Sequence, residues 1–340
     1  MKTDRADDDV RAALAAAEDE TATPAERAEM LMEIASLLQQ RPKDVRHLRS
    51  AIDLYARALD ICPEDECLLL ARILARQGTA LLALPGESVE PLEAARAGFE
   101  AAIPALLDSG RPEEMAEAEM NLGLTLQNLA GRNRAKIADA IAAYHRALRT
   151  FDKHRFPKEY AILQNNLATA FLSMPLTDNR ARMREALAVQ AFEEALRAVN
   201  LIDHPSEYAM LQNNLGNALQ YSSSSHMIEN NLRALDAYDE ALKVRTRAAM
   251  PAEYANTLAN KANCLRNLPD DPQRPDDGNR ANLVAARQSY LECRELFTSA
   301  GEVEKARLVA DACEQIDREL LSAPPARSRG LADSRAQHLN

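Results

Sequence analysis

The chain contains no tryptophan, little glycine and few aromatic residues. Phe, Tyr and Trp together make up 4% of its 340 residues, and only 10 residues are glycine. A chain with so few large side chains buries little apolar area per residue, which argues against a thick globular core. Its abundant residues are Ala, Leu, Glu and Arg, which have high helix propensity, so the composition favours closely packed helices.

Cysteine is scarce and shows no paired spacing. There is no C-x-x-C pair among the five cysteines, which are Cys62, Cys67, Cys264, Cys293 and Cys313. An odd number without paired spacing favours reduced, buried thiols over a disulfide framework.

Positive charge and long apolar runs are lacking as well. The formal net charge is −11, and no sustained basic run in the body of the chain offsets it, so nucleic acid is not an expected partner. No apolar run approaches the length that crosses a bilayer, and the first 20 residues are too acidic for a secretory signal. We therefore expect a soluble, cytoplasmic protein that does not bind membranes.

Motifs of catalysis and metal binding are missing. The serine run at 222–225 has no nucleophile-elbow pattern, and the acidic loop at 270–278 lacks the alternate ligand spacing of a calcium site. The six histidines show no metal-ligand spacing, and there is no Gly-rich phosphate loop. The sequence thus predicts no metal, no cofactor and no enzymatic activity. A hydrolase or metal enzyme hidden in the loops is the alternative from another class.

What the chain does contain is a repeat. The stretch HPSEYAMLQNNLGNAL at 204–219 resembles FPKEYAILQNNLATAF, which begins 48 residues earlier. Its opening, Pro-x-Glu-x-Ala, occurs five times and once in degenerate form, beginning at Pro24, Pro63, Pro112, Pro157, Pro205 and Pro251. Proline suits the first helical position and Glu suits the first turn, so the motif predicts six helix starts.

Two further patterns follow each opening. Seven residues after the opening Ala comes a small residue: Ala35, Gly78, Gly123, Ala168, Gly216 and Ala262. A second segment then repeats a small residue, an aromatic residue four positions later and a small residue three positions after that, with the aromatic at Tyr55, Phe99, Tyr144, Phe192, Tyr238 and Tyr290. These spacings place each set on one face of a helix, where small residues let a neighbouring helix approach closely.

A helix with a small residue, followed by a helix carrying an aromatic between small residues, resembles the tetratricopeptide repeat. The resemblance covers about residues 24 to 321, although successive small positions lie 43 to 48 residues apart instead of about 34. It implies an all-α solenoid of six antiparallel hairpins in a right-handed superhelix without a domain boundary. The expected hairpins span about 24–61, 63–107, 112–153, 157–202, 205–247 and 251–299, followed by a capping helix at 302–321.

The flanks and loops complete this picture. We expect residues 1–23 to be a frayed helix or disordered, and residues 322–340 to be a disordered tail rich in Pro, Ser and Arg. The surplus length falls in loops between the two helices of a hairpin. In three of these loops an Asn precedes an Arg, and Asn133, Asn179 and Asn279 are predicted to cap the helices that follow.

Asparagine recurs along the predicted first helices. Counting from the opening Ala as position 1, position 6 is Asn in the last four repeats: Asn121, Asn166, Asn214 and Asn260. In the family that the chain resembles, first helices line a concave groove, and positions 2, 5, 6 and 9 reach the ligand. A side-chain amide can bond both the N–H and the C=O of a peptide. The resemblance therefore implies a partner-binding set that also includes Asn165, Asn213, Asn217, Asn263, Gln220, Tyr221 and Arg266.

The same asparagines also allow a structural interpretation, in which they bond a neighbouring repeat and hold the hairpins in register. Positions 5 and 6 lie about 100° apart around a helix, so Asn165 and Asn166 cannot both face one groove equally. The leading hypothesis is a non-catalytic scaffold that binds an extended peptide or protein segment in an Asn-lined groove toward the C-terminal half. The alternative is a regulatory or adaptor subunit of an enzyme, for example of a caspase-like protease system, docking through the long loops. The oligomeric state is not predicted.

Overall fold

The computed structural model describes residues 21–40, 42, 44–174, 180–222 and 226–322. Over these residues the protein is all-α, with thirteen α-helices and a short 3-10 turn, η1 (Pro275–Asp277). No helix among them combines the length and the apolar character that spanning a membrane requires. The predicted frayed N-terminal segment lies almost entirely outside the described residues, as does the predicted tail.

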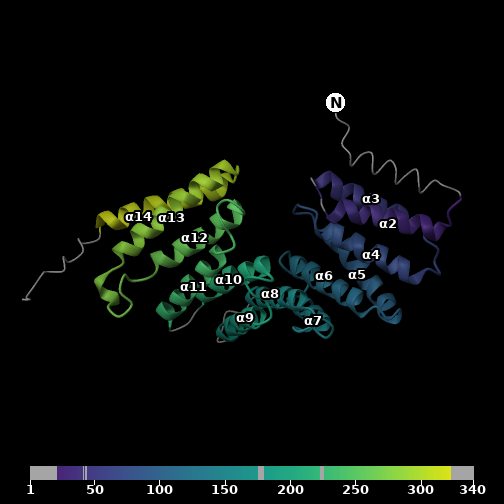
Figure 1. Ribbon diagram of the computed structural model, residues 1–340, viewed down its shortest axis with the longest axis horizontal. Helices are drawn as coiled ribbons and strands as arrows, with labels where there is room; N and C mark the ends of the chain where they lie inside the picture. Colours follow the sequence, from purple (N-terminus) through teal and green to yellow (C-terminus); the bar gives the residue numbers. More distant parts are fainter. Residues whose placement is uncertain (1–20, 41, 43, 175–179, 223–225, 323–340) are drawn as a thin grey trace, which may run out of the picture. The chain divides into compact units, whose positions relative to one another are not determined.

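The helices pack as sequential hairpins (Figure 1). In chain order the α-helices are α2 Pro24–Gln40, α3 Val45–Ile61, α4 Cys67–Leu82, α5 Glu90–Asp108, α6 Pro112–Ala130, α7 Ile137–Ala147, α8 Pro157–Leu172, α9 Arg180–Leu196, α10 Pro205–Gln220, α11 Met227–Leu242, α12 Pro251–Arg266, α13 Arg280–Ser299 and α14 Val303–Ser322. Extensive contacts join α2 to α3, α4 to α5, α6 to α7, α10 to α11 and α12 to α13, and α14 packs on α13. The fold class predicted from the repeat is therefore confirmed.

The chain divides into two compact units. Unit 1 spans Met1–Thr177 and unit 2 spans Asp178–Asn340, so α8 belongs to the first and α9 to the second. The sequence predicted an array with no internal boundary, and the division falls inside its fourth hairpin. Hairpins in a linear array contact only their neighbours, so nothing in the repeat pattern itself indicates where such an array divides.

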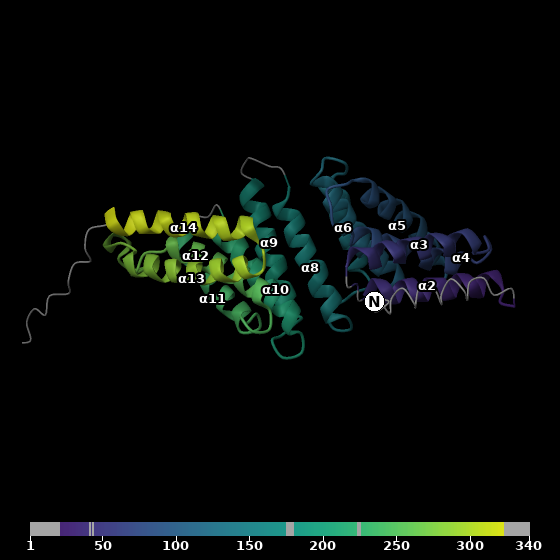
Figure 2. The same ribbon diagram turned by 90° about the horizontal axis from the view of Figure 1, so that it is seen from above.

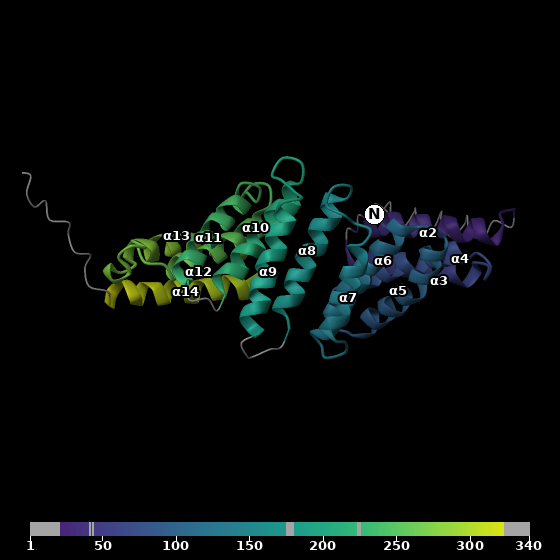
Figure 3. The same cartoon turned by 90° about the horizontal axis from the view of Figure 1, so that it is seen from below.

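Within each unit the first helices of successive hairpins lie beside one another. In unit 1, α4 contacts both α2 and α6, and α6 contacts α8. In unit 2, α10 contacts α12, and α13 contacts both α12 and α14. Figures 2 and 3 show the helices of each unit from above and from below. The first helices of unit 1 thus form a layer, and α3, α5 and α7 cover its other side.

The repeated prolines begin five of the six predicted helices. Pro24, Pro112, Pro157, Pro205 and Pro251 each occupy the first position of a helix. The degenerate copy behaves differently, because the helix begins at Cys67, four residues after the proline. The Glu66 N–H donates to the Pro63 carbonyl in a turn, so the prediction that Pro63 starts a helix was wrong. A turn fits here because the degenerate copy lacks the Pro-x-Glu-x-Ala spacing.

The predicted stripe of the second helices forms the core. All six aromatics are at most 2% exposed, and so are the small residues on either side of them. The small residues of the first helices are buried as well. A Cβ added at Gly123 would lie 2.4 Å from Cε1 of Tyr144, and one added at Gly216 would lie 2.6 Å from Cε1 of Tyr238. In these two hairpins, and where Gly78 meets Phe99, the aromatic side chain therefore packs against the small residue of the preceding helix, as the spacing predicted.

Position 4 of the first helix departs from the family pattern of a bulky apolar residue. In α6 it is Glu119, which is 4% exposed and accepts two hydrogen bonds from Arg146 of α7, at 2.6 and 2.7 Å. A buried carboxylate needs such a paired donor. An ion pair inside the hairpin thus replaces the apolar contact in this repeat.

Of the predicted asparagine caps, Asn133 was wrong, and Asn279 was correct in position but makes no capping hydrogen bond with its side chain. Asn133 adopts a left-handed conformation (φ 57°), and the N-cap of α7 is Lys136. Asn279 holds the N-cap position of α13, but its Nδ2 donates to the Arg266 carbonyl. The carboxylate of Asp270 instead accepts from the backbone N–H groups at the start of α13, at 2.8 Å each. A loop residue distant in sequence thus replaced the local cap. The third predicted cap, Asn179, lies outside the described residues.

Candidate functional site

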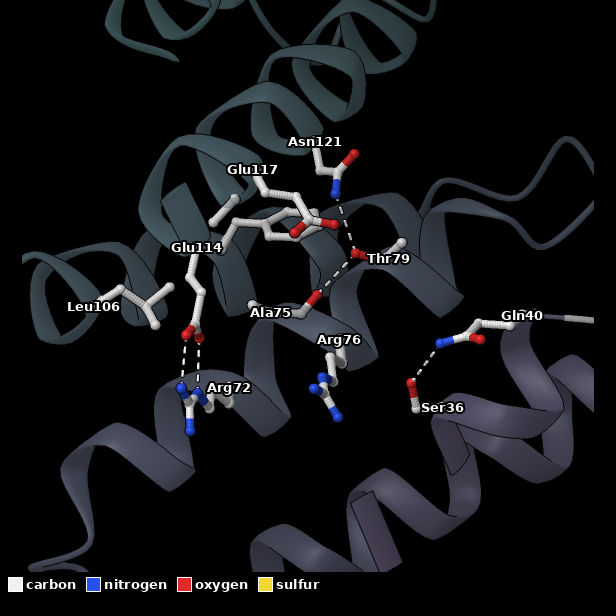
Figure 4. A pocket seen from close by; sticks show the side chains of 12 residues that line it. Ser36, Gln40, Arg72, Ala75, Arg76, Thr79, Leu106, Glu114, Glu117 and Asn121 are labelled. Carbon is white, nitrogen blue, oxygen red and sulfur yellow. Dashed lines mark hydrogen bonds and ion pairs between the residues drawn. The ribbon is translucent and has the colours of Figure 1, made fainter. Parts of the chain in front are cut away.

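A groove runs along the first helices of unit 1. Residues from α2, α4, α5 and α6 enclose a cavity of about 530 Å³ (Figure 4). Its lining consists of Ser36, Gln40, Arg72, Ala75, Arg76, Thr79, Phe99, Leu106, Glu114, Glu117, Ala118 and Asn121. The groove therefore has small residues on its floor and charged and polar groups along its walls.

Most polar residues of the groove occupy the positions predicted to meet a ligand. Arg72 and Glu117 are at position 2, and Arg76 and Asn121 are at position 6. Ala75 is at position 5, and Ser36 and Thr79 are at position 9. Sequence reasoning named these positions but followed the recurring asparagines into the last four repeats. The charged residues at the same positions of earlier repeats were the signal that could have indicated this groove.

Two helix faces oppose each other across the groove. On α4 the face consists of Arg72, Ala75 and Thr79, and on α6 it consists of Glu114, Glu117 and Asn121. Each set is spaced three and four residues apart, which places its members on one side of a helix. Figure 4 shows Glu117 and Asn121 directed from α6 toward α4.

The two ends of this pair of faces are closed by direct contacts. At one end the Arg72 guanidinium donates to both oxygens of Glu114, at 2.7 and 2.6 Å. At the other end Nδ2 of Asn121 donates to Oγ1 of Thr79 at 3.2 Å, and Thr79 donates to the carbonyl of Ala75 at 3.0 Å. Oδ1 of Asn121 accepts no hydrogen bond from any described residue, so it is left as an acceptor in the groove.

The middle of the pair is open. Glu117 makes no hydrogen bond or ion pair with another described residue, and the residue across from it is Ala75. The nearby Arg76 turns to α2, where its Nη1 donates to Glu33 at 2.7 Å. The groove therefore contains one carboxylate that forms no direct ion pair with a described residue.

The charges of the groove perturb one another. The hydrogen bonds from Arg72 hold the pKa of Glu114 below its ordinary value, and the same pair raises the pKa of Arg72. The side chain of Glu117 is exposed to the groove, but the surrounding walls displace water from it. This desolvation raises its pKa, and the carboxylates of Glu114 and Glu159 add to the rise.

The remaining predicted asparagines of unit 1 bond each other. Asn165 is 8% exposed, and its Nδ2 donates to Oδ1 of Asn166 at 3.2 Å. Asn166 is half-buried. The expectation that one member of the pair is structural agrees with this difference in exposure, whereas a ligand contact of Asn166 stays a prediction.

Unit 2 repeats this pair on α10. Asn213 is 8% exposed and donates to Oδ1 of Asn214 at 3.1 Å. Asn260 of α12 donates in turn to Oδ1 of Asn213 at 3.3 Å. These amides thus link neighbouring first helices, which is the alternative interpretation that the sequence left open. A ligand contact of Asn214 stays a prediction.

Three other predicted site residues accept hydrogen bonds from the buried tyrosines of unit 2. Tyr238 lies 2.8 Å from both Oδ1 of Asn217 and Oε1 of Gln220. The Tyr290 hydroxyl donates to Oδ1 of Asn263. In this position the amides hold the aromatic side chain of the same hairpin.

The last two predicted residues differ in exposure. Tyr221 is 67% exposed just after α10. Arg266 is half-buried and contacts α14, donating to Gln315 at 3.0 Å and pairing with Glu319. Arg266 therefore attaches the last helix, and Tyr221 is the member of the predicted set that is most accessible to a partner.

The tyrosine contacts reveal a pairing that sequence reasoning missed. Tyr55 donates to Gln39 at 2.8 Å, and Tyr144 donates to Gln127 at 2.9 Å, both glutamines being at position 12 of their first helix. Where the aromatic is Phe99 or Phe192, position 12 is Leu82 or Leu172. Burial raises the pKa of Tyr55 to about 12, so its hydroxyl remains a donor at neutral pH. In the first five repeats, the joint occurrence of Tyr with Gln and of Phe with Leu was visible in the sequence, whereas the sixth has Arg266 at position 12 and Tyr290 bonds Asn263 at position 9.

The cysteines and acidic residues form no second site. No group of His, Cys, Asp and Glu that could hold a metal ion occurs in the part of the chain that the structure describes. Four of the cysteines are buried, and desolvation raises the pKa of Cys293 to about 12, which keeps it a thiol at neutral pH. Cys67 is exposed at the start of α4, because the helix begins there and not at Pro63, so the expectation of a buried thiol was wrong for this residue.

Comparison with known proteins identifies no family. No family model matches the chain, and a comparison with curated proteins found no match. The solved structures similar to it include one described as a circular tandem repeat protein with novel repeat topology and enhanced subunit contact surfaces. The two share 16% sequence identity over 93% of this chain and 74% of that chain, with a TM-score of 0.29. A superposition this weak carries no argument about function.

Proposed function

We propose that the chain is a long-period tetratricopeptide-like protein of the cytoplasm, and that it is a non-catalytic scaffold. Its ligand is an extended segment of another protein, bound along the groove of α2, α4 and α6. The observation that carries this proposal is the set of groove-facing groups at positions 2, 5, 6 and 9 of successive first helices. The proposed site therefore lies in unit 1 and not in the C-terminal half, where the asparagines recur.

The walls of the groove suit a peptide backbone. Asn121 is oriented by its bond to Thr79, so its Oδ1 is fixed as an acceptor for a peptide N–H. The Arg72–Glu114 salt bridge joins α4 to α6, and the Arg76–Glu33 salt bridge joins α4 to α2. The three first helices are therefore already held together, and little ordering remains when a ligand binds. A preformed groove of about 530 Å³ accommodates a few residues of an extended chain.

Backbone hydrogen bonds alone give weak binding. Each contributes about 0.5–1.5 kcal/mol, whereas association costs at least about 4 kcal/mol. Side-chain contacts with the groove must therefore supply most of the affinity. Ala75, which is half-buried in the groove, provides apolar surface for such contacts.

The proposal can be tested with a library of random ten-residue peptides selected on the full chain. A selected peptide is then titrated by fluorescence anisotropy against wild type, Ala75→Tyr and Ala97→Tyr. Ala75 lines the groove, so a tyrosine there fills it and is expected to weaken binding roughly tenfold or more. Ala97 is exposed on α5, outside the groove lining, and makes the same substitution a matched control.

The expected pattern is loss of binding in Ala75→Tyr alone, with similar melting temperatures for all three proteins. Equal affinity in wild type and Ala75→Tyr would show that the peptide binds elsewhere. A selection that enriches no peptide would contradict the proposal as a whole.

A further inference from the structure

Within the groove of unit 1, the gap between α4 and α6 is closed at both ends and open in its middle. The Arg72–Glu114 salt bridge closes one end, and the Asn121–Thr79 hydrogen bond closes the other. Between them Glu117 faces Ala75, whose methyl group can make no polar contact. Two of the three facing positions on α4 and α6 thus form a direct bond, and the third leaves space and an unpaired carboxylate.

The charged groups around this gap carry an excess of negative charge. From α4, Arg72 is engaged by Glu114 and Arg76 is engaged by Glu33. Glu117 forms no ion pair with a described residue: Arg76 attracts it but is bound to Glu33, and the carboxylates of Glu114 and of Glu159 in α8 repel it. A cationic group is therefore the complement that the groove lacks.

On the α6 side of the gap, two acceptor groups make no hydrogen bond with a described residue. Glu117 offers a carboxylate, and Asn121 offers Oδ1 because its Nδ2 is used by Thr79. These two residues lie four apart on α6 and so share one face. A donor-rich side chain can engage both, and its aliphatic stem can lie along Ala75, which also lines the gap.

We propose that the segment bound in this groove carries a lysine or arginine that enters between α4 and α6 and pairs with Glu117. This inference rests on the proposed function and specifies its ligand chemistry. At each end of the gap, α4 itself supplies the polar partner of an α6 residue, and in the middle the ligand supplies the partner of Glu117. Because the pair forms inside a walled groove, it excludes water better than a surface salt bridge and favours basic over neutral segments.

The test uses the full chain and three pools of ten-residue peptides. The central residue is fixed as Lys or Arg in the first pool, as Gln or norleucine in the second and as Glu in the third. Binding of each pool is measured by enrichment, and the best lysine peptide is titrated beside its Lys-to-Gln analogue. N-acetyl-lysine N-methylamide is included as a small basic ligand without a peptide chain.

The basic pool is expected to be enriched over the other two. Glu117→Gln should weaken the lysine peptide roughly tenfold and leave its Gln analogue nearly unchanged. Glu117→Lys should invert the preference toward the acidic pool. Glu113→Gln makes the same change on an exposed residue of α6 that does not line the groove, and it should bind like wild type.

The outcomes separate this inference from the proposed function. Equal enrichment of the three pools, or unchanged lysine-peptide affinity in a folded Glu117→Gln, overturns the inference and leaves peptide binding intact. Binding of the small lysine amide as tightly as the peptide also overturns it, because the peptide chain then contributes nothing. Enrichment of no pool overturns both.

Discussion

At the scale of single residues, Glu117 lies where its charge is unfavourable to the empty fold, and the proposal makes it the residue that binds the ligand. Its carboxylate is desolvated by the groove walls and lies near Glu114 and Glu159, which together raise its pKa. Arg76, which forms a salt bridge with Glu33, opposes this rise. Under the proposal, Glu117 is a binding residue that costs stability, and such a trade-off between function and stability is common.

The sign of this effect gives a stability prediction. A carboxyl with a raised pKa in the folded state binds its proton more tightly there, so its stabilising contribution is present below the ordinary Glu pKa of about 4.3 and is lost as pH rises through the raised value. Glu117→Gln is therefore expected to raise the melting temperature at pH 7. The difference in melting temperature between the variant and the wild type should shrink as the pH falls toward the ordinary pKa of glutamic acid and below it. Thermal melts followed by circular dichroism across this range measure it.

Glu113→Gln is again the control. Glu113 lies in the first turn of α6, where negative charge is favourable, so its neutralisation should lower the melting temperature slightly or leave it unchanged. If Glu117→Gln lowers stability at neutral pH as well, the carboxylate contributes a stabilising contact in the folded state, and this account of it fails.

Another residue-scale feature, the tyrosine–amide pairing, could have been found before the structure. Gln39 and Gln127 recur at position 12 wherever the first three repeats have a tyrosine, and Leu82 stands there in the repeat with Phe99. A buried hydroxyl needs an acceptor, and a phenyl ring needs none. The residue at position 12 of the first helix and the aromatic residue of the second helix are therefore linked by a simple physical rule.

At the scale of helices, the contact between a ring and a glycine fixes how closely the two helices of a hairpin approach. Gly123 on α6 leaves room for the ring of Tyr144 on α7, and a Cβ would lie 2.4 Å from Cε1 of that ring. The ring is fully buried, so it has little space into which it can move. The helices themselves would have to separate.

Gly123→Ala is therefore expected to destabilise the protein although alanine is the better helix former. Overpacking typically costs about 1–3 kcal/mol, and the gain in helix propensity offsets about 1 kcal/mol, which leaves a net loss of about 1–2 kcal/mol. Urea denaturation measures the change. Gly131→Ala is the matched control at the end of the same helix, where the nearest atom would lie 3.5 Å from the new Cβ.

The control should be neutral or stabilising by about 0.4–1 kcal/mol, because alanine restricts the unfolded chain and fits the helical φ of −59° at this position. Destabilisation by both substitutions to the same extent would contradict the steric explanation.

The starts of the helices show how far local sequence determines an element. Pro112 and Pro157 begin helices because proline at the first helical position loses no hydrogen bond. The same residue type at Pro63 forms a turn, and the asparagine expected to cap α13 was replaced by Asp270. Capping depends on which side chain reaches the free N–H groups, and a loop from elsewhere in the chain can reach them first.

At the scale of the molecule, contacts between hairpins are made mainly with sequence neighbours. In such arrays stability is approximately a sum of hairpin and nearest-neighbour terms. A destabilising change should therefore loosen the helices around it and leave distant hairpins unaffected. The division into two units places α10–α14 and α2–α6 in separate compact parts.

Gly216→Ala tests this expectation in unit 2. A Cβ there would lie 2.6 Å from Cε1 of Tyr238, so the substitution should force α10 and α11 apart. Hydrogen exchange followed by mass spectrometry should then show faster exchange in α10–α12 and unchanged exchange in α2–α5. An increase spread evenly over both units would mean that the chain unfolds as one cooperative body.

The sequence by itself determined the periodic features of this protein: the repeated hairpin, the buried aromatic stripe and the small residue beneath each ring. These features follow from spacing along one helix, which a linear sequence records directly. Only the tertiary structure decided which polar residues are used up and which remain free. Arg72 with Glu114 and Asn121 with Thr79 are each 42 residues apart, so their pairing depends on the register between neighbouring hairpins. That register leaves Glu117 opposite an alanine, and no property of α6 alone indicates it.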